Sequence, residues 1–132
     1  MKISNQLSAQ FKEYNKVFNE ININEYEKFI KKLKILRLKK NKLYLAGNGG
    51  SSSIASHVAV DFLKNCSINA QTFNEYNLIT CFSNDYGYEE WVKRAVEFYG
   101  DEGDVFIGIS SSGSSKNILN GCDEARRRNF SK

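Results

Sequence analysis

The chain has 132 residues, 41% of them hydrophobic and 13% aromatic, which suffices for one domain with a real core. Its apolar runs stay well short of the roughly 18 residues of a membrane-spanning helix, and no signal peptide opens it, so we expect a cytoplasmic protein without a membrane partner. Cys66, Cys81 and Cys122 are odd in number and lack metal-type spacing, which favours reduced thiols over a disulfide framework.

The net charge of +4 hides an uneven distribution. Residues 1–42 carry 11 Lys or Arg against 4 Glu, a balance of +7, whereas residues 43–132 carry 8 against 11, a balance of −3. A basic N-terminal segment suits nucleic acid, but its aromatic residues take core-type helical positions and do not alternate with the lysines. We therefore interpret the lysines as a solvated helix face and expect no nucleic-acid partner.

Two amphipathic helices are predicted at the N-terminus. Apolar side chains recur every three or four positions through residues 3–21 and again through residues 26–36. Asn24 and Glu27 form a capping-box pattern at the start of the second helix. We assign residues 1–40 to this helical pair, and its aromatic-rich first stripe predicts oligomerisation against a partner subunit.

A buried strand, a glycine loop and a helix follow. Leu43 to Ala46 form a short apolar run, Gly-Asn-Gly-Gly at 47–50 breaks it, and a helix is predicted over 54–64 after three serines. Glycines let the backbone approach a ligand closely, and the first amides of a helix carry the positive end of its dipole. This pattern is typical of an anion site, although a tight turn is the plainer interpretation of the glycines.

His57 and Asp61 lie on the predicted helix, four residues apart, and so share one face. An imidazole and a carboxylate one turn apart can hold a divalent metal or relay a proton. The alternatives are a core histidine and a plain surface acid. A metal needs more ligands than these two, and the sequence shows no obvious third.

The middle of the chain carries weaker signals. They predict a strand at 68–73, a short helix within 74–83, a turn at 84–88 in which Asp85 can accept from hydroxyls, and a helix at 89–99 that Gly100 ends.

The strand, loop and helix pattern then returns. A strand at 104–109 leads into the loop 110–115, which has five serines in six residues, and a helix over 116–128 follows. The alternation predicts a parallel sheet in an α/β fold, and the carboxyl ends of such strands would bring both loops to one crevice. We expect the crevice to bind phosphate, with a flexible linker as the alternative for the second loop. Neither a Walker-type lysine loop nor a dinucleotide glycine fingerprint is present, which argues against nucleotide cofactors.

These motifs resemble those of the sugar isomerase (SIS) domain family, and within it most closely the phosphoheptose isomerases. The matching stretches are 46–51 together with His57, 83–88, and 103–117. The resemblance covers essentially the whole chain. It implies a doubly wound, three-layer α/β fold of flavodoxin-like or Rossmann-like type over 41–132, of which the C-terminal part is missing.

The family resemblance implies an activity as well. It indicates an aldose–ketose isomerase that converts sedoheptulose 7-phosphate to manno-heptose 7-phosphate, in heptose biosynthesis for lipopolysaccharide or capsule. It also implies a zinc cofactor and a homotetramer with active sites between subunits.

By the same resemblance, single residues receive roles. The phosphate would be gripped by Ser110, Ser111, Ser112 and Ser115. The rest of the substrate would be bound at Asn48, Gly49, Gly50, Ser51 and Asp85. His57 matches a zinc ligand, and Asp61 falls where the family has a glutamate that serves as ligand and base.

Two departures from the family pattern have consequences. Asp61 is one methylene shorter than the glutamate, which pulls the carboxylate back by roughly 1.5 Å, and a displacement near 1 Å can cost on the order of a hundredfold in rate. The family's other metal ligands, a glutamine and a histidine, lie in a C-terminal half that this chain lacks. We therefore expect the 132-residue chain alone to be inactive, and we assign the isomerase activity to an intact protein.

Two other functions remain open at this stage. Recognition of the phosphate group does not determine the number of carbon atoms in the sugar, so another sugar phosphate is an alternative substrate. Some proteins that this sequence resembles keep the fold without known catalysis and regulate DNA replication by binding the initiator protein. The basic N-terminal helices and the aspartate at position 61 fit that regulatory alternative.

Overall fold

A computed structural model describes residues 3–130 of the chain, which fold as two compact units divided between Lys32 and Leu33. The first unit consists of α1 (Ile3–Asn19) and the beginning of α2 (Ile23–Lys39). None of the α1 side chains is buried. Whether the apolar stripe of α1 meets a partner subunit therefore stays a prediction.

The start of α2 differs from the predicted capping box. The Asn22 side-chain oxygen accepts from the backbone N–H groups of Asn24 and Glu25, at 3.1 and 3.4 Å. These bonds make Asn22 the capping residue and place Asn24 inside the first turn, so the assignment of the cap to Asn24 is wrong.

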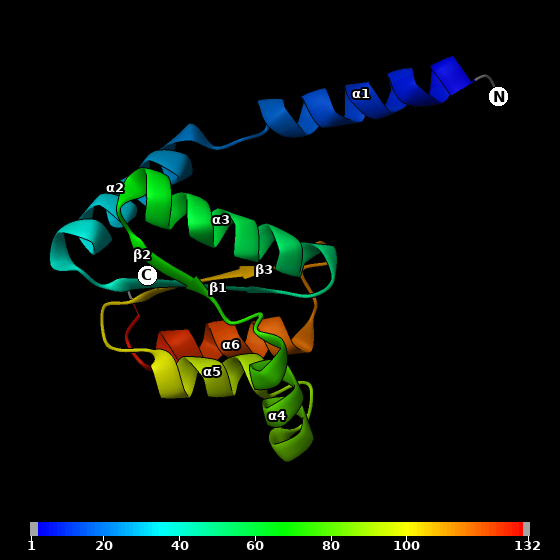
Figure 1. The fold of residues 1–132 in the computed structure, drawn as a ribbon. Helices are drawn as coiled ribbons and strands as arrows, with labels where there is room; N and C mark the ends of the chain where they lie inside the picture. The colour runs from blue at the N-terminus through cyan, green and yellow to red at the C-terminus, as the bar shows by residue number, and fades with distance from the viewer. Residues whose placement is uncertain (1–2, 131–132) are drawn as a thin grey trace. The chain divides into compact units, whose positions relative to one another are not determined.

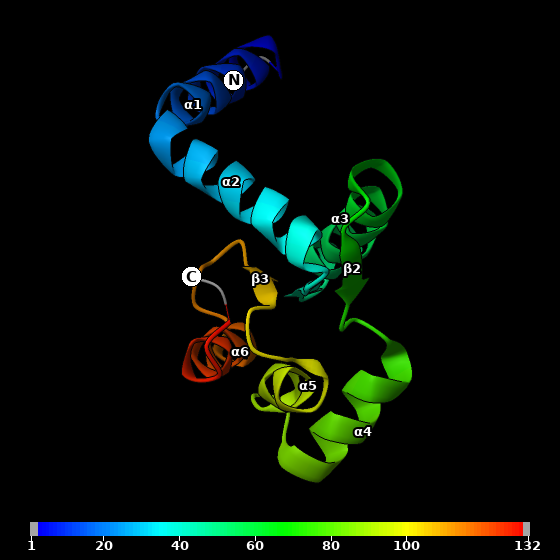
Figure 2. The same ribbon diagram turned by 90° about the vertical axis from the view of Figure 1, so that its left-hand side faces the viewer.

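The second unit is built on a parallel sheet of β1 (Lys42–Gly47), β2 (Asn69–Thr72) and β3 (Val105–Ile109), in the order β2-β1-β3. Its helices are α3 (Gly50–Cys66), α4 (Tyr76–Tyr86), α5 (Trp91–Tyr99) and α6 (Lys116–Arg127). Helix α3 covers one face of the sheet, and α5 and α6 lie side by side on the other (Figure 1). Figure 2 shows α4 leading from β2 to α5. The predicted three-layer α/β fold is thereby confirmed.

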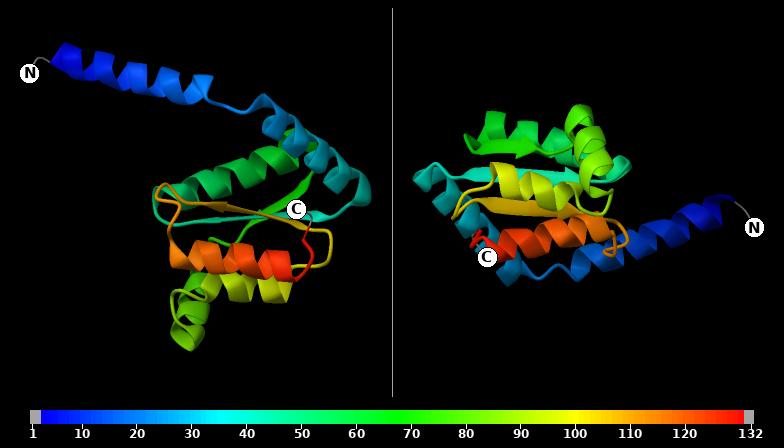
Figure 3. Two further views of the ribbon diagram at one scale, coloured as in Figure 1. Left: turned by 180° about the vertical axis from the view of Figure 1, so that it is seen from behind. Right: turned by 90° about the horizontal axis from the view of Figure 1, so that it is seen from below.

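The strand register decides where the two predicted loops lie. In the central pairing, Gly47 at the end of β1 is opposite Ile109 at the end of β3. The loop after each strand therefore begins at the same edge of the sheet, and Figure 3 shows both chain segments turning there. The strand ends thus bring the two loops to one end of the sheet, as expected, while a shared phosphate-binding crevice stays a prediction.

The core lies between the sheet and the α5–α6 pair. Trp91 of α5 is fully buried, and the ring of Tyr44 on β1 stacks on Phe73 with 4.7 Å between centroids. The hydroxyl of Tyr44 donates to the Tyr99 carbonyl at 2.7 Å, which satisfies the polar tip of a buried side chain. Such packing holds β1 in the middle of the unit.

A buried carboxylate fixes the opposite edge of the sheet, where β1 and β3 begin. Asp104 is 1% exposed and accepts from the backbone N–H groups of Lys42 and Asp101, at 2.8 and 3.0 Å. The Lys42 ammonium lies 2.9 Å from the Asp101 carboxylate, a bond that raises the lysine pKa, and 3.8 Å from Asp104. The amino ends of both strands are thus tied together before the loops begin.

The region around residues 84–88 departs from the predicted turn. Helix α4 continues to Tyr86, and Gly87, with φ at +90°, ends it by donating its N–H to the Ser83 carbonyl. The Asn84 amide bonds the neighbouring Asp85 carboxylate at 2.9 Å. These two side chains therefore satisfy each other and do not compete with the helical backbone, so the turn at 84–86 was a wrong prediction.

None of the helices described between residues 3 and 130 is long and apolar enough to cross a membrane.

Candidate functional site

The first loop is short because α3 returns directly against β1. A Cβ atom on Gly47 would lie 2.5 Å from the backbone C and O atoms of Ser51, so only glycine fits there. Gly49 caps α3 with φ at +53°, in the left-handed region. Helix α3 begins at Gly50, which places the three serines in its first turn and corrects the predicted start at residue 54.

The peptide at Gly47 is held from the neighbouring segment. Asn74, just after β2, accepts from the Gly47 N–H at 3.0 Å and donates to the Gly47 carbonyl at 2.7 Å. Its own side chain is positioned by Thr72, whose hydroxyl lies 3.3 Å from the Asn74 amide oxygen. The end of β1 is therefore braced before the chain turns into the loop.

The second loop gathers hydroxyl groups. The Ser110 hydroxyl lies 3.1 Å from that of Ser115 and 3.4 Å from that of Ser112, and Ser114 donates to Ser112 at 3.0 Å. Ser115 precedes α6 but makes no side-chain cap bond to it. The Ser112 hydroxyl also accepts from the Ser114 backbone N–H at 3.2 Å. Hydroxyls that bond mainly to one another can turn their protons toward an anion, and the first amides of α6 carry the positive end of its dipole.

An amide pair joins the two loops. The Asn48 amide nitrogen donates to Asn117 at 2.9 Å, and the Asn117 amide nitrogen donates to Asn48 at 2.8 Å. The Tyr88 hydroxyl donates to the same Asn48 oxygen at 3.1 Å. Asn48, Tyr88 and Asn117, which come from three separate segments of the chain, thus meet at this edge of the sheet.

Asp85 lies on the last turn of α4 and is exposed. Its nearest partners are Asn84 and the Cys81 thiol, whose sulfur is 3.6 Å from the carboxylate. Loss of water around the thiol, and then the Asp85 charge, raise the pKa of Cys81. Cys81 is therefore held as a thiol and not as a thiolate nucleophile, and all three cysteines are free.

His57 and Asp61 meet as predicted by their spacing, with 3.4 Å between the imidazole Nε2 and the carboxylate Oδ2. Both side chains are exposed, at 79% and 52%, whereas Ala55 and Ala59 of the same helix are buried. The pair therefore lies on the outer face of α3, opposite the face that packs on the sheet. The structure does not bring it to the serine loop of the same chain.

The fit of a zinc ion can be tested on this pair. Within residues 3–130 no group of three or more His, Cys, Asp or Glu side chains is arranged to hold a metal ion. A catalytic zinc takes three protein ligands and a structural zinc takes four. His57 and Asp61 thus supply two donors, and the described residues do not complete a zinc site by themselves.

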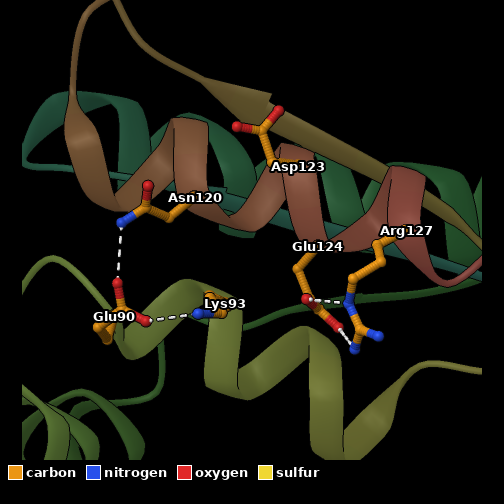
Figure 4. A pocket seen from close by; sticks show the side chains of 6 residues that line it. All are labelled: Glu90, Lys93, Asn120, Asp123, Glu124 and Arg127. Atoms are coloured by element: carbon orange, nitrogen blue, oxygen red, sulfur yellow. Dashed lines mark hydrogen bonds and ion pairs between the residues drawn. The ribbon is translucent and has the colours of Figure 1, made fainter.

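A concave region lies between α5 and α6, a groove of about 200 Å³ lined by polar and charged residues (Figure 4). Glu90 pairs with Lys93 at 3.0 Å, and Glu124 pairs with Arg127 through two hydrogen bonds. Asn120 donates to Glu90 at 3.1 Å. Because these polar groups satisfy one another, the groove offers a ligand little that is unpaired, and we place the candidate site at the loops.

Sequence reasoning missed three side chains that organise the site: Asn74, Tyr88 and Asn117. Their partners lie 27 to 69 positions away in the chain, so no local periodicity reports them. Tyr88 and Asn117 do stand inside the family-like stretches, and an asparagine two residues after the serine loop was the available signal.

Comparison with known proteins identifies the family. The SIS domain model matches residues 9–131. The phosphoheptose isomerase of Fusobacterium nucleatum is 38% identical over 107 residues, covering 77% of this chain and 55% of the relative. That of Sulfurimonas denitrificans is 34% identical over 133 residues, covering 96% and 68%. Phosphoheptose isomerase 2 of Campylobacter jejuni is 43% identical over 96 residues, covering 67% and 47%.

A solved structure agrees with the sequence matches. The phosphoheptose isomerase of Neisseria gonorrhoeae is 26% identical and superimposes with a TM-score of 0.87, over 98% of this chain and 72% of that protein. The chain spans roughly half to two thirds of the curated relatives named above. With the family model over nearly its whole length, the chain belongs to the SIS-domain family.

Proposed function

We propose that the intact protein is an aldose–ketose isomerase that converts sedoheptulose 7-phosphate to manno-heptose 7-phosphate. The observation that carries this proposal is the meeting of the two loops at adjacent strand ends, tied by the Asn48–Asn117 pair. The similarity to proteins named phosphoheptose isomerase supports the choice of sugar phosphate, and with it a place in heptose biosynthesis for lipopolysaccharide or capsule.

Phosphate recognition is assigned to the second loop. The Ser110 hydroxyl lies 3.1 Å from that of Ser115 and 3.4 Å from that of Ser112, and these hydroxyls have few other partners. Together with Ser111 and the first amides of α6 they offer several donors to one anion. Asn48, Gly49, Gly50, Ser51 and Asp85 are assigned to the rest of the substrate.

The isomerisation itself is a proton transfer between two carbons. A carboxylate takes a proton from C1 of the ketose while the C2 carbonyl oxygen gains a proton, which gives an enediol. The proton is then returned to C2, and the C1 hydroxyl loses its proton as the C1 carbonyl forms. We assign the carboxylate role to Asp61, whose Oδ2 atom lies 3.4 Å from the His57 imidazole Nε2.

The outward position of His57 and Asp61 has a consequence for assembly. A pair that lies away from its own serine loop acts on a bound sugar only if another copy of the chain presents its crevice to it. We therefore propose a homotetramer with sites between subunits. Zinc, bound there through His57 and Asp61 and through donors outside the described residues, would stabilise negative charge on the substrate oxygen.

The first experiment tests the Asp61 assignment in the intact protein. Asp61→Asn should abolish the conversion of sedoheptulose 7-phosphate while leaving its binding, measured by calorimetry, within about threefold, because the amide keeps the shape and loses the base. Asp123→Asn, an exposed acid on α6, serves as the control and should keep full turnover. Undiminished turnover in Asp61→Asn would remove Asp61 from the mechanism.

A second experiment tests the phosphate site on the chain as given. Ser110→Ala with Ser115→Ala should weaken the binding of inorganic phosphate about tenfold, because both hydroxyls donate to it. Ser53→Ala, on the exposed side of the first turn of α3, is the matched control. Equal phosphate affinity in all three proteins would contradict the site.

The regulatory alternative is favoured by one observation, the two-donor His57–Asp61 pair without a third ligand among the described residues. Metal analysis of the intact protein separates the functions. Stoichiometric zinc supports the isomerase, and an intact protein without metal supports a binding module.

A further inference from the structure

We propose that Asn117 is a positioning residue that fixes the Asn48 side chain as a hydrogen-bond donor toward the substrate. This inference rests on the proposed function of the site. It concerns whether Asn48 donates or accepts hydrogen bonds toward the substrate, which is decided by the other contacts of its amide nitrogen and oxygen.

The Asn117 side chain is buried, with 3% of the residue exposed, in the first turn of α6. A buried amide needs partners for its polar atoms, and Asn117 finds them in Asn48, through bonds of 2.9 and 2.8 Å in opposite directions. Asparagine is a weak helix former, so helix propensity does not account for it. Its contribution is the bridge between the loops.

These contacts occupy most of the hydrogen-bonding positions of the Asn48 amide. Its oxygen accepts from the Asn117 amide and from the Tyr88 hydroxyl, at 2.8 and 3.1 Å, which occupies both lone pairs. Its nitrogen gives one of two N–H groups to Asn117. Within residues 3–130 the second N–H has no recorded partner, so Asn48 has one donor and no acceptor to offer.

A single N–H group recognises an oxygen that can accept, such as the oxygen atom of a sugar hydroxyl or carbonyl, and it cannot accept a proton from a hydroxyl. The structure therefore narrows the role that the family resemblance gives to Asn48. Asn48 is half-buried, and rotation of its amide alone would set nitrogen against nitrogen and oxygen against oxygen in the pair with Asn117. Tyr88 reinforces the same orientation, since its proton is directed at the amide oxygen.

The test compares two asparagines of α6 that each bridge to another segment. Asn117→Leu removes both bonds to Asn48, whereas Asn120→Leu removes bonds to Glu89 and Glu90 and leaves Asn48 untouched. Binding of sedoheptulose 7-phosphate is measured by calorimetry, and the Asn48 side-chain ¹⁵NH₂ signal is followed by NMR during the titration. A general loss of packing would affect both variants, but only the positioning role changes the Asn48 signal.

We expect Asn117→Leu to weaken sugar phosphate binding about tenfold and to abolish the ligand-induced shift of the Asn48 ¹⁵NH₂ signal, with both properties kept in Asn120→Leu. Wild-type affinity in Asn117→Leu, or equal losses in the two variants, would overturn the inference while the proposed function stands. A wild-type chain that binds neither sedoheptulose 7-phosphate nor inorganic phosphate would overturn both.

Tyr88→Phe provides a test that does not depend on the buried position. Tyr88 is 55% exposed, so its replacement should leave the fold intact. Loss of the bond to the Asn48 oxygen should lower sugar phosphate affinity about two- to threefold. An affinity equal to or above that of the wild type would mean that the orientation of Asn48 does not matter, and would overturn the inference.

Discussion

At the scale of single residues, the site depends on how closely two backbone segments approach. Gly47 ends β1 where the first turn of α3 crosses it, and its peptide is held by two bonds to Asn74. The neighbouring Gly50 has open space around the position of a Cβ atom. The two glycines of this motif therefore have different roles. Gly47 allows the strand and the helix to approach each other closely, whereas Gly50 lies in the exposed first turn of the helix.

A pair of alanine variants tests this difference. Gly47→Ala should lower the free energy of unfolding by roughly 1–3 kcal/mol, because a Cβ at 2.5 Å from the Ser51 backbone forces the helix away from the strand. Gly50→Ala should leave stability unchanged or raise it by up to about 1 kcal/mol, since alanine favours the helix. Urea unfolding of the two variants measures both values. Equal free energies of unfolding in the two variants would show that a Cβ atom on Gly47 has no steric cost.

At the scale of elements, α6 has a different role at each end. Its first turn follows the serine loop, and its last turn contains the buried Glu124. Glu124 is 4% exposed, and its carboxylate accepts two hydrogen bonds from Arg127. These bonds, and then the arginine charges nearby, lower the Glu124 pKa below its usual value of 4.5. A carboxyl whose pKa is lower in the folded state contributes stability above the unfolded-state pKa and loses it as the pH falls through the folded value.

Stability should therefore decrease in acid in a way that depends on Glu124. Glu124→Gln should be less stable than the wild type by about 1 kcal/mol at pH 7. The difference should shrink as the pH falls below about 4.5 and vanish only below the lowered folded-state pKa of Glu124, where the wild-type carboxyl is protonated too. Urea unfolding at pH 7 and pH 3 measures this. The control Asp123→Asn, which breaks an exposed pair with Arg126, should have nearly the wild-type free energy of unfolding at either pH. If this free energy changed equally with pH in all three proteins, the assignment to Glu124 would be wrong.

The elements also show what the sequence could predict. The strands and the long helices were predicted from the local periodicity of apolar residues, and each lies within a few residues of its predicted position. The errors fall where short polar side chains decide a boundary. Asn22 caps α2 in place of Asn24, and Asn84 with Asp85 continues α4 where a turn was predicted. The site's long-range bonds, such as Asn48 to Asn117, depend on the folded register and leave no periodic signal.

At the scale of the whole molecule, two features support the proposed assembly of several copies of the chain. The stripe on α1 includes Leu7, Phe11 and Phe18, which are 52%, 64% and 69% exposed. The sheet has three strands, and the described part of the chain pairs β3 on one side only. Apolar faces of this extent are typical of interaction surfaces. We infer that α1 takes part in the proposed tetramer.

A charge placed on the stripe tests this role. Phe11→Glu should shift the chain toward smaller species in analytical ultracentrifugation, because a carboxylate at a buried contact between copies is strongly unfavourable. Ala9→Glu changes the charge equally on the opposite side of α1 and should keep the wild-type distribution. A wild-type chain that sediments as a monomer would exclude α1 from self-association.

The pairing of Gly47 with Ile109 has a consequence for how this fold tolerates insertions and deletions. One residue added within β1 or β3 would advance the following loop by about 3.3 Å and turn each side chain beyond it to the other face of the sheet. The asparagine bridge would then no longer reach across. Changes in length are therefore compatible with ligand recognition only where they fall outside the paired strands, so substrate preference is expected to diversify by replacement of loop residues at constant strand length.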